Sequence, residues 1–281
     1  MSIVTSCDRA GAAVRARRPV ALTIAGTDSS GGAGVIADLK TFEAHDVWGT
    51  AAVTAVTAQN TLGVQAFDAV TPELVRAQIA SVASDLGVDA AKTGMLASAA
   101  VVEAVAATVA ELGVGPLVVD PVLVSKHGDR LLAADAVDAI RTLLLPLATV
   151  VTPNLPEAEA LVGFPVRDRA GMESAARALL ELGPEVVLVK GGHLTGDEGG
   201  RSSPDCLLTA DAGAPMWLEG ARLPGRHTHG TGCVLSAAIT AELARGMEPV
   251  DACIAAKRFV EKAIAAGLDL GAGVGPVNPG W

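Results

Sequence analysis

The stretch VALTIAGTDSSGGAG, residues 20–34, starts with a short apolar run and passes into a glycine-rich segment. An uninterrupted apolar run of this length, 20–26, is typical of a strand that is buried on both faces of a sheet. The glycines after it predict a tight turn that leads from the strand into a helix. The fold class therefore depends on whether this strand-and-turn unit recurs along the chain.

The unit does recur. Predicted buried strands lie at 20–26, 50–57, 88–94, 116–120, 148–152 and 186–190. Segments with apolar residues three and four positions apart predict helices, among them 72–86, 133–145, 232–245 and 249–267. This alternation predicts an α/β fold, a three-layer α/β/α sandwich around a mostly parallel central sheet.

Composition excludes several classes of protein. The formal net charge of −10 argues against a nucleic-acid groove or an anionic membrane surface as the partner. The longest uncharged run, 47–67, is interrupted by polar residues and is not expected to span a membrane. The cysteines are scattered and form no C-x-x-C pair, which indicates neither a disulfide framework nor a zinc site. We therefore expect a cytoplasmic protein.

The chain is expected to form one domain after a short extension. Residues 1–18 place their arginines after a very short apolar stretch, an order that is wrong for a secretory signal, so we expect a loose N-terminal extension. No proline- or serine-rich linker interrupts residues 19–281. In open α/β sheets ligands bind beyond the carboxyl ends of the strands, so the residues directly after strands are the candidates for a site.

The turn after the first strand resembles two phosphate-binding motifs without matching either. Residues 26–31 have the spacing of a P-loop, but the Lys and Ser or Thr that should follow are absent. Residues 32–37 imitate a dinucleotide fingerprint, yet no acidic residue follows at the end of the second strand. Two interpretations remain: a turn that serves packing only, or backbone that approaches a ligand closely, with Asp28 as a hydrogen-bond acceptor.

Polar residues also follow the second predicted strand. Gln59 can donate and accept hydrogen bonds at once, which suits the edge of a flat heterocycle. The alternative is turn chemistry, with Asn60 capping a bend.

Two acids and an amide follow later strands. Asp120 ends one predicted strand, and Asn154 and Glu157 follow the next. Such oxygen ligands hold Mg²⁺ through its waters while phosphates supply the remaining ligands. Either acid alone would more often cap a helix or lie in solvent, so the hypothesis depends on their joint occurrence.

A lysine and a glycine-rich helix start complete the candidates. Lys190 ends an otherwise apolar strand, where a lysine is costly unless it is paired, and a phosphate would pair it. The N–H groups of residues 230–233, at a predicted helix start, form an anion cradle. The same helix start is expected to lower the pKa of Cys233, so that its thiolate accepts a proton from a substrate hydroxyl or orients that hydroxyl. The alternative is an inert, small hydrophobic side chain.

Together these stretches resemble the hydroxymethylpyrimidine/phosphomethylpyrimidine kinases of thiamine biosynthesis, a branch of the ribokinase-like fold. The matching stretches follow in order between residues 20 and 277: ALTIAGTDSSGGAGVIADLKTFEAHDVWGTAAVTAVTAQNTLGV, KTGML, VVDPVLVSKHGDRLL, TPNLPEAEAL, VKGGHL, HGTGCVLSAAI and GVGPV. The resemblance is specific, because ribokinase-like sugar kinases generally carry aspartate at the position of Cys233.

The resemblance implies an activity, its cofactors and an assembly. The expected enzyme transfers phosphate from ATP to the hydroxymethyl group of 4-amino-5-hydroxymethyl-2-methylpyrimidine and then phosphorylates the monophosphate to the pyrophosphate. ATP, Mg²⁺ and a homodimer are implied. A pyridoxal or pyridoxine kinase, with overlapping activity, is the closest alternative, and a non-catalytic ligand-binding protein is a second.

The resemblance also implies roles for single residues. The substrate-binding residues are Gly26, Asp28, Gln59, Met95 and Val122. The residues that contact the nucleotide are Lys190, Asn154 and Thr231. The metal is surrounded by Asp120 and Glu157, with Asn154 beside them. The catalytic residues are Gly230, Thr231, Gly232 and Cys233, which form the anion hole, together with Lys190.

The chain departs from the family pattern at two places near these residues. Val35 and Ile36 stand where Ile-Gln is common, which removes one polar contact near the substrate, and Val234 follows the cysteine where Thr is frequent. Two loops, 191–204 and 123–130, are further expected to cover the nucleotide, the second with Lys126 available to a phosphate.

Overall fold

A computed structural model describes residues 17–123, 134–194, 202–223 and 225–281. Most of the expected N-terminal extension, the loop with Lys126 and the centre of the loop 191–204 lie outside the described residues. That residues 19–281 form a single domain stays a prediction.

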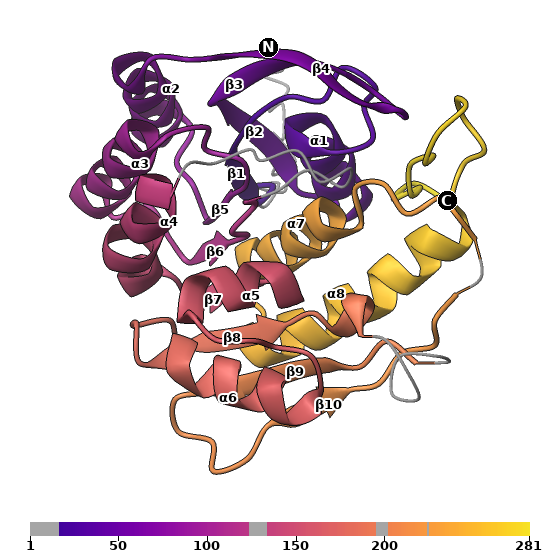
Figure 1. Cartoon of the computed structure of the whole chain (residues 1–281). Coiled ribbons are helices and arrows are strands. Elements are labelled where there is room, and N and C mark those ends of the chain that lie inside the picture. The colour runs from indigo at the N-terminus through magenta and orange to yellow at the C-terminus, as the bar shows by residue number, and fades with distance from the viewer. Residues whose placement is uncertain (1–16, 124–133, 195–201, 224) are drawn as a thin grey trace, which may run out of the picture.

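The centre of the protein is one eight-stranded sheet (Figure 1). Its strands are β1 (Val20–Ala25), β2 (Trp48–Val53), β5 (Ala90–Thr93), β6 (Leu117–Val119), β7 (Val150–Val151), β8 (Val186–Val189), β9 (Asp205–Thr209) and β10 (Met216–Leu218). Their order is β10-β9-β8-β7-β6-β5-β1-β2, and only the pairs that involve β9 are antiparallel. The predicted mostly parallel sheet is confirmed.

Helices cover both faces of this sheet (Figure 1). One face carries α2 (Pro72–Asp85), α3 (Ala99–Leu112), α4 (Ala134–Ala139), α5 (Leu155–Val162) and α6 (Arg169–Leu180). The other face carries α1 (Gly34–Ala44), α7 (Thr231–Ala244) and α8 (Pro249–Ala265). The helical turns η1 (Ile140–Leu144), η2 (Leu145–Leu147) and η3 (Gly191–His193) complete the layers. In β6, Val118 packs toward α7 and α8, whereas Val119 packs toward the opposite layer. The predicted three-layer sandwich is therefore confirmed, and none of the described helices is long and apolar enough to cross a membrane.

The predicted strand 50–57 is wrong as a single element. β2 ends at Val53, and β3 (Ala55–Asn60) pairs instead with β4 (Gly63–Ala69) in a separate two-stranded sheet. The break occurs where the neighbouring strand β1 ends: the N–H of Thr54 still donates to the Ala25 carbonyl, 3.0 Å away, and beyond that point the contact is with the turn after β1, where the Thr27 N–H donates to the Ala55 carbonyl at 2.9 Å. The strands β4, β9 and β10 were not among the predicted elements.

A buried ion pair joins α1 to the centre of the sheet. Lys92 in β5 and Asp38 in α1 are both fully buried, with Lys92 Nζ 2.9 Å from Asp38 Oδ2. The hydroxyl of Thr23 in β1 donates to the same oxygen, at 2.6 Å. Lysine and aspartate are almost never fully buried unless they are paired, so the fold requires that both charges be present or both be absent.

We predict that Lys92→Met lowers the free energy of unfolding by about 3–5 kcal/mol, because it leaves the Asp38 carboxylate buried without its counter-charge. The double variant Asp38→Leu/Lys92→Met removes both charges and should recover most of that loss. Urea denaturation followed by circular dichroism measures both variants. Glu173→Ala, which breaks the exposed Glu173–Arg177 pair, is the control and should change the free energy by less than about 1 kcal/mol. A double variant as unstable as Lys92→Met alone would contradict the prediction.

Candidate active site

A cavity of about 530 Å³ lies beyond the carboxyl ends of the parallel strands, between the β3–β4 hairpin and the start of α7. All of the residues that the sequence predicted for the site line this one cavity: Gly26, Asp28, Gln59, Met95, Asp120, Val122, Asn154, Glu157, Lys190, Gly230, Thr231, Gly232 and Cys233. They come from both ends of the chain, and the order of the strands brings them together.

Lys190 is at the charged end of this cavity. Its Nζ lies 3.0 Å from Asp120 Oδ1 and 3.9 Å from Glu157 Oε2. A Cβ atom on Gly232 would lie 3.4 Å from the same Nζ, so the backbone at the start of α7 is in contact with the lysine. The lysine, the two acids and the helix start therefore meet at one point.

Asp120 follows β6 and is held from three sides. Lys190 Nζ and the Thr152 hydroxyl donate to its Oδ1, at 3.0 and 3.3 Å, and the Ser236 hydroxyl of α7 donates to its Oδ2, at 3.2 Å. Burial by itself raises the pKa of Asp120, but Lys190 and Lys92 outweigh it and hold the pKa below its ordinary value. Asp120 is therefore a carboxylate at neutral pH.

Glu157 is both a helix cap and a cavity residue. The Asn154 Oδ1 accepts the Glu157 N–H at 2.9 Å, and Glu157 Oε2 accepts the Asn154 N–H at 2.8 Å, which is a capping box at the start of α5. Burial raises the pKa of Glu157 to about 7, with Lys190 opposing the shift and Asp120 adding to it. The capping alternative that the sequence left open is thus realised in the same residue that lines the cavity.

The acids fit a metal ion that shares its ligands with phosphate. Within the described ranges, no group of three or more His, Cys, Asp and Glu side chains is placed to hold a metal ion. Burial is the main cause of the raised pKa of Glu157, and Lys190 opposes it without cancelling it, so a further cation beside Glu157 would favour its ionised form. Carboxylate oxygens suit Mg²⁺, which usually keeps several waters and takes phosphate oxygens as further ligands.

The start of α7 is suited to an anion. Gly230 precedes the helix with a φ of +83°, and no side chain caps the first turn. The first N–H groups of an α-helix have no partner within the helix. The Thr231 hydroxyl donates to the Thr228 carbonyl at 2.8 Å, which fixes the turn in front of the helix. The Thr231 N–H already donates to the Thr228 carbonyl at 3.4 Å, so the anion cradle stays a prediction that depends on the other N–H groups of residues 230–233, among which Gly232 lies beside Lys190 Nζ.

The predicted lowering of the Cys233 pKa is wrong. Cys233 is the third residue of α7 and is partly exposed. Burial raises the pKa of its thiol to about 12, and the nearby Lys92 ammonium opposes only part of this shift. Desolvation in the cavity outweighs the effect of the helix start. Cys233 is therefore a protonated thiol at neutral pH in this structure.

Part of the cavity wall is apolar and closely packed. The Gly26 N–H donates to the Met95 carbonyl at 3.1 Å, and a Cβ atom on Gly26 would lie 2.8 Å from Met95 Cε. The glycine is thus required for the Met95 side chain to lie where it does. The Val122 N–H donates to the Asp120 carbonyl at 2.9 Å, a tight turn that brings Val122 to the same cavity.

Two predicted substrate residues differ in detail from expectation. Gln59 does not end a strand of the large sheet but lies in β3, at an irregularity of the β3–β4 pairing. Asp28 does not present a free acceptor: its Oδ1 accepts from the Ser30 N–H and hydroxyl, at 2.9 and 2.7 Å, and its Oδ2 lies 2.7 Å from His229 Nε2.

The sequence analysis missed His229 and Lys92, which also line the cavity. The signal for His229 was its place directly before the Gly-Thr-Gly turn, and the signal for Lys92 was a lysine inside a strand. Neither signal indicates a role until the partners across the fold are known.

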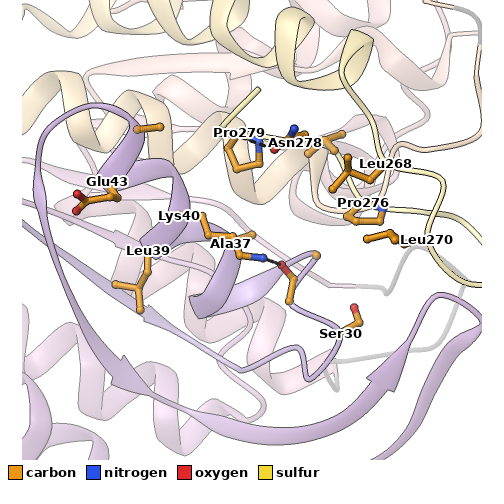
Figure 2. Close-up of a pocket in the computed structure, with 15 residues that line it drawn as sticks. Ser30, Ala37, Leu39, Lys40, Glu43, Leu268, Leu270, Pro276, Asn278 and Pro279 are labelled. Atoms are coloured by element: carbon orange, nitrogen blue, oxygen red, sulfur yellow. Dashed lines mark hydrogen bonds between the residues drawn. The ribbon is translucent and has the colours of Figure 1, made fainter.

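A second cavity, of about 620 Å³, lies between α1 and the C-terminal segment. Figure 2 shows Leu39, Lys40 and Glu43 of α1 on one side of it and Leu268, Pro276 and Asn278 of the C-terminal segment on the other. None of the residues that the sequence predicted for the site lines it. The smaller cavity is therefore the candidate active site.

Comparison with known proteins gives consistent relatives. The sequence model of a family described as phosphomethylpyrimidine kinase matches residues 28–278. A hydroxymethylpyrimidine/phosphomethylpyrimidine kinase of Streptomyces coelicolor is 52% identical over 266 residues, 94% of this chain and 95% of the relative. The protein of the same name from Bacillus subtilis is 44% identical over 258 residues, 92% of this chain and 93% of the relative.

Solved structures of enzymes with two different activities share this fold. The ADP complex of Bacillus subtilis pyridoxal kinase has a TM-score of 0.86 at 39% identity and covers 93% of this chain and 97% of its own. A phosphomethylpyrimidine kinase from Clostridium difficile has a TM-score of 0.76 at 38% identity and covers 88% of this chain and 100% of its own.

We predict that Glu157 makes the protein less stable as the pH rises from about 4.5 to about 7. The folded state keeps a proton on Glu157 up to a pKa of about 7, whereas the unfolded chain loses it near the ordinary value of 4.5. The unfolding free energy of the wild type minus that of Glu157→Gln should therefore fall by about 2–3 kcal/mol between pH 5 and pH 8 in metal-free buffer. Gln preserves the capping box.

Urea titrations at several pH values measure this difference, and Glu159→Gln, on the same helix, is the matched control. A difference that does not change with pH, or that rises, would show that Glu157 is ionised throughout.

Proposed function

The chain belongs to the phosphomethylpyrimidine kinase family, and we propose that its 530 Å³ cavity binds 4-amino-5-hydroxymethyl-2-methylpyrimidine, phosphorylates the hydroxymethyl group, and then phosphorylates the monophosphate to the pyrophosphate. The protein is a kinase of thiamine biosynthesis, and its phosphoryl donor is ATP. The observation that carries the proposal is the meeting of Lys190, the start of α7 and the two acids in the same cavity that Gln59 lines.

The phosphate end of the site is assigned from its charges. Lys190 and the N–H groups of Gly230, Thr231, Gly232 and Cys233 bind the phosphates, since both carry positive charge toward the cavity. Asn154 and Thr231 lie beside them and contact the nucleotide. Positive groups that are fixed in place favour the charge that spreads over the transferring phosphoryl group.

Asp120 and Glu157 would hold Mg²⁺, whose chemistry there is to neutralise and orient phosphate oxygens. A cation between them would also favour the ionised form of Glu157, which burial otherwise disfavours.

Cys233 orients the attacking hydroxyl. The transition state of phosphoryl transfer is loose, so the nucleophile needs alignment more than early loss of its proton. A thiol with a raised pKa suits alignment by a hydrogen bond, and the nearby Lys92 ammonium favours the thiolate if the hydroxyl proton is to move to sulfur.

The ring binds against the apolar part of the wall. Gln59 pairs with the polar edge of the heterocycle, Met95 packs on its face, and Gly26 and Val122 line the wall. Asp28 also lines the cavity and acts through the groups that it holds.

We further propose a cytoplasmic homodimer. The β3–β4 hairpin exposes large apolar side chains: Val56 is 58% exposed, Leu62 63% and Phe67 45%. Apolar side chains gathered around one hairpin favour a surface that a second copy of the chain covers.

A pyridoxal kinase is the second candidate, because pyridoxal kinases share the fold at 39% identity or less. Both substrates are flat nitrogen heterocycles with a hydroxymethyl arm.

We predict that the purified protein, given ATP, Mg²⁺ and the pyrimidine alcohol, forms first the monophosphate and then the pyrophosphate, which mass spectrometry of the products detects. The kcat/KM for the pyrimidine alcohol should exceed that for pyridoxal. A preference for pyridoxal of about tenfold or more would overturn the assignment.

For Cys233→Ala we expect kcat to fall by at least about a hundredfold, while the Kd for the pyrimidine alcohol changes little, because the thiol acts on the hydroxyl in the transition state. Stopped-time kinase assays and calorimetric titration measure the two quantities. Cys253→Ala, in the buried face of α8, is the control and should retain its kcat. An unchanged kcat in Cys233→Ala would show that Cys233 is an inert packing residue with no part in catalysis.

A further inference from the structure

A buried histidine joins two of the substrate-side residues. His229 Nε2 lies 2.7 Å from Asp28 Oδ2 and 3.4 Å from Gln59 Nε2. His229 is 5% exposed and Asp28 1%, so water does not separate the three groups. One ring nitrogen therefore faces both a carboxylate and a side-chain amide.

The backbone of His229 is fixed by the C-terminal segment. Its N–H donates to the Gly275 carbonyl at 3.1 Å, and its carbonyl accepts the Val277 N–H at 3.0 Å. The side chain fits because residue 32 is glycine: a Cβ atom there would lie 2.6 Å from His229 Cδ2. The backbone bonds fix the position from which the side chain starts, and the ring packs closely against Gly32.

The backbone of Gln59 is fixed as well. The Ser29 hydroxyl donates to the Gln59 carbonyl and accepts the Gln59 N–H, both at 2.8 Å. The β3–β4 register shifts between Ala58 and Gln59, and such irregularities re-aim a side chain beside a site. With the backbone fixed and the end of the side chain beside His229, the orientation of the Gln59 amide decides which of its groups faces the histidine.

The position of one proton decides that orientation. Burial by itself raises the pKa of Asp28, but the hydrogen bonds from His229 and Ser30 outweigh it and hold the pKa below its ordinary value. An ionised carboxylate only accepts hydrogen bonds, so His229 Nε2 must carry the proton that it donates to Asp28. The same nitrogen then cannot accept a hydrogen bond from Gln59.

An amide can present either of its ends to His229. If the N–H₂ group of Gln59 faces His229 Nε2, two hydrogen-bond donors oppose each other. Rotation of the Gln59 amide by 180° about χ3 brings the amide oxygen to the histidine N–H instead. The N–H₂ group is then the end of Gln59 left to meet a ligand in the cavity that the residue lines.

We propose that His229, held by Asp28, is a positioning residue that fixes the amide of Gln59 with its N–H₂ group toward the cavity, so that the site selects heterocycles with an unprotonated ring nitrogen at that edge. The identity of the ring rests on the proposed function. The role of His229 is separate from that of Cys233 and Lys190, because it acts through Gln59 on binding and not on phosphoryl transfer.

The test is calorimetric binding, without ATP, of the pyrimidine alcohol and of the two analogues in which one ring nitrogen is replaced by C–H. The wild type should bind one of the analogues about ten- to a hundredfold more weakly than the parent, because a buried donor loses its acceptor. His229→Phe should bind the parent more weakly and lose most of this discrimination, whereas His229→Gln, which keeps a donor near the Nε2 position, should retain it.

Non-additivity separates positioning from a structural role. In a Gln59→Leu background, His229→Phe should not weaken ring binding further, because its effect passes through the missing amide. His227→Gln is the matched control, since His227 lines neither cavity, and it should bind all three compounds like the wild type. Should His229→Phe fail to fold with Asp28 unpaired, Asp28→Asn/His229→Phe removes the buried charge and is expected to show the same loss of discrimination.

The outcomes distinguish this inference from the proposed function. If His229→Phe weakens the binding of all three compounds equally, the positioning role is refuted. It is also refuted if His229→Phe weakens ring binding as much in the Gln59→Leu background as in the wild type. If the wild type does not bind the pyrimidine alcohol, the proposed function fails, and the selection of ring nitrogens fails with it.

Discussion

The contact between two glycine turns is the constraint on which the site depends. The turn after β1 and the turn before α7 approach so closely that a Cβ atom on Gly230 would lie 1.8 Å from the Gly32 carbonyl oxygen. Only glycine allows this approach, and Gly230 also needs its positive φ. The contact brings the first N–H groups of α7, His229 and Asp28 to one cavity. The proposed phosphate-binding and ring-binding residues are therefore positioned by the same two turns.

Charge and burial determine the state of each titratable group in that cavity. The chain carries a net charge of −10, yet Lys190 and the start of α7 give the cavity a positive side where phosphates can bind. Lys190 is shared by two carboxylates, and burial raises the pKa of Glu157 to about 7 although the lysine opposes the shift. Burial also keeps Cys233 protonated. The site is therefore arranged for alignment and charge stabilisation, with little need of a strong base.

The sequence predicted the layers and most of the candidate site, because both follow from local patterns joined by one topological rule. The helices expected at 232–245 and 249–267 agree with α7 and α8 to within two residues, because apolar periodicity is a local property of each segment's sequence. Asp120, Asn154 and Lys190 meet because parallel strands place their carboxyl ends on one edge. The strand expected at 50–57 was wrong, because where β2 ends depends on the length of its neighbour β1.

What the sequence determined by itself is thus the fold class, the family and the residues that follow strands. What only the tertiary structure decided is how those residues act on one another. The pKa of Cys233 depends on how much of the cavity is shielded from water, which no local pattern reports. Asp28, Gln59 and His229 are distant in the sequence, and their shared proton exists only because the fold brings them within hydrogen-bond distance. Burial and long-range contact are properties of the packed chain, and they set the protonation states on which the chemistry depends.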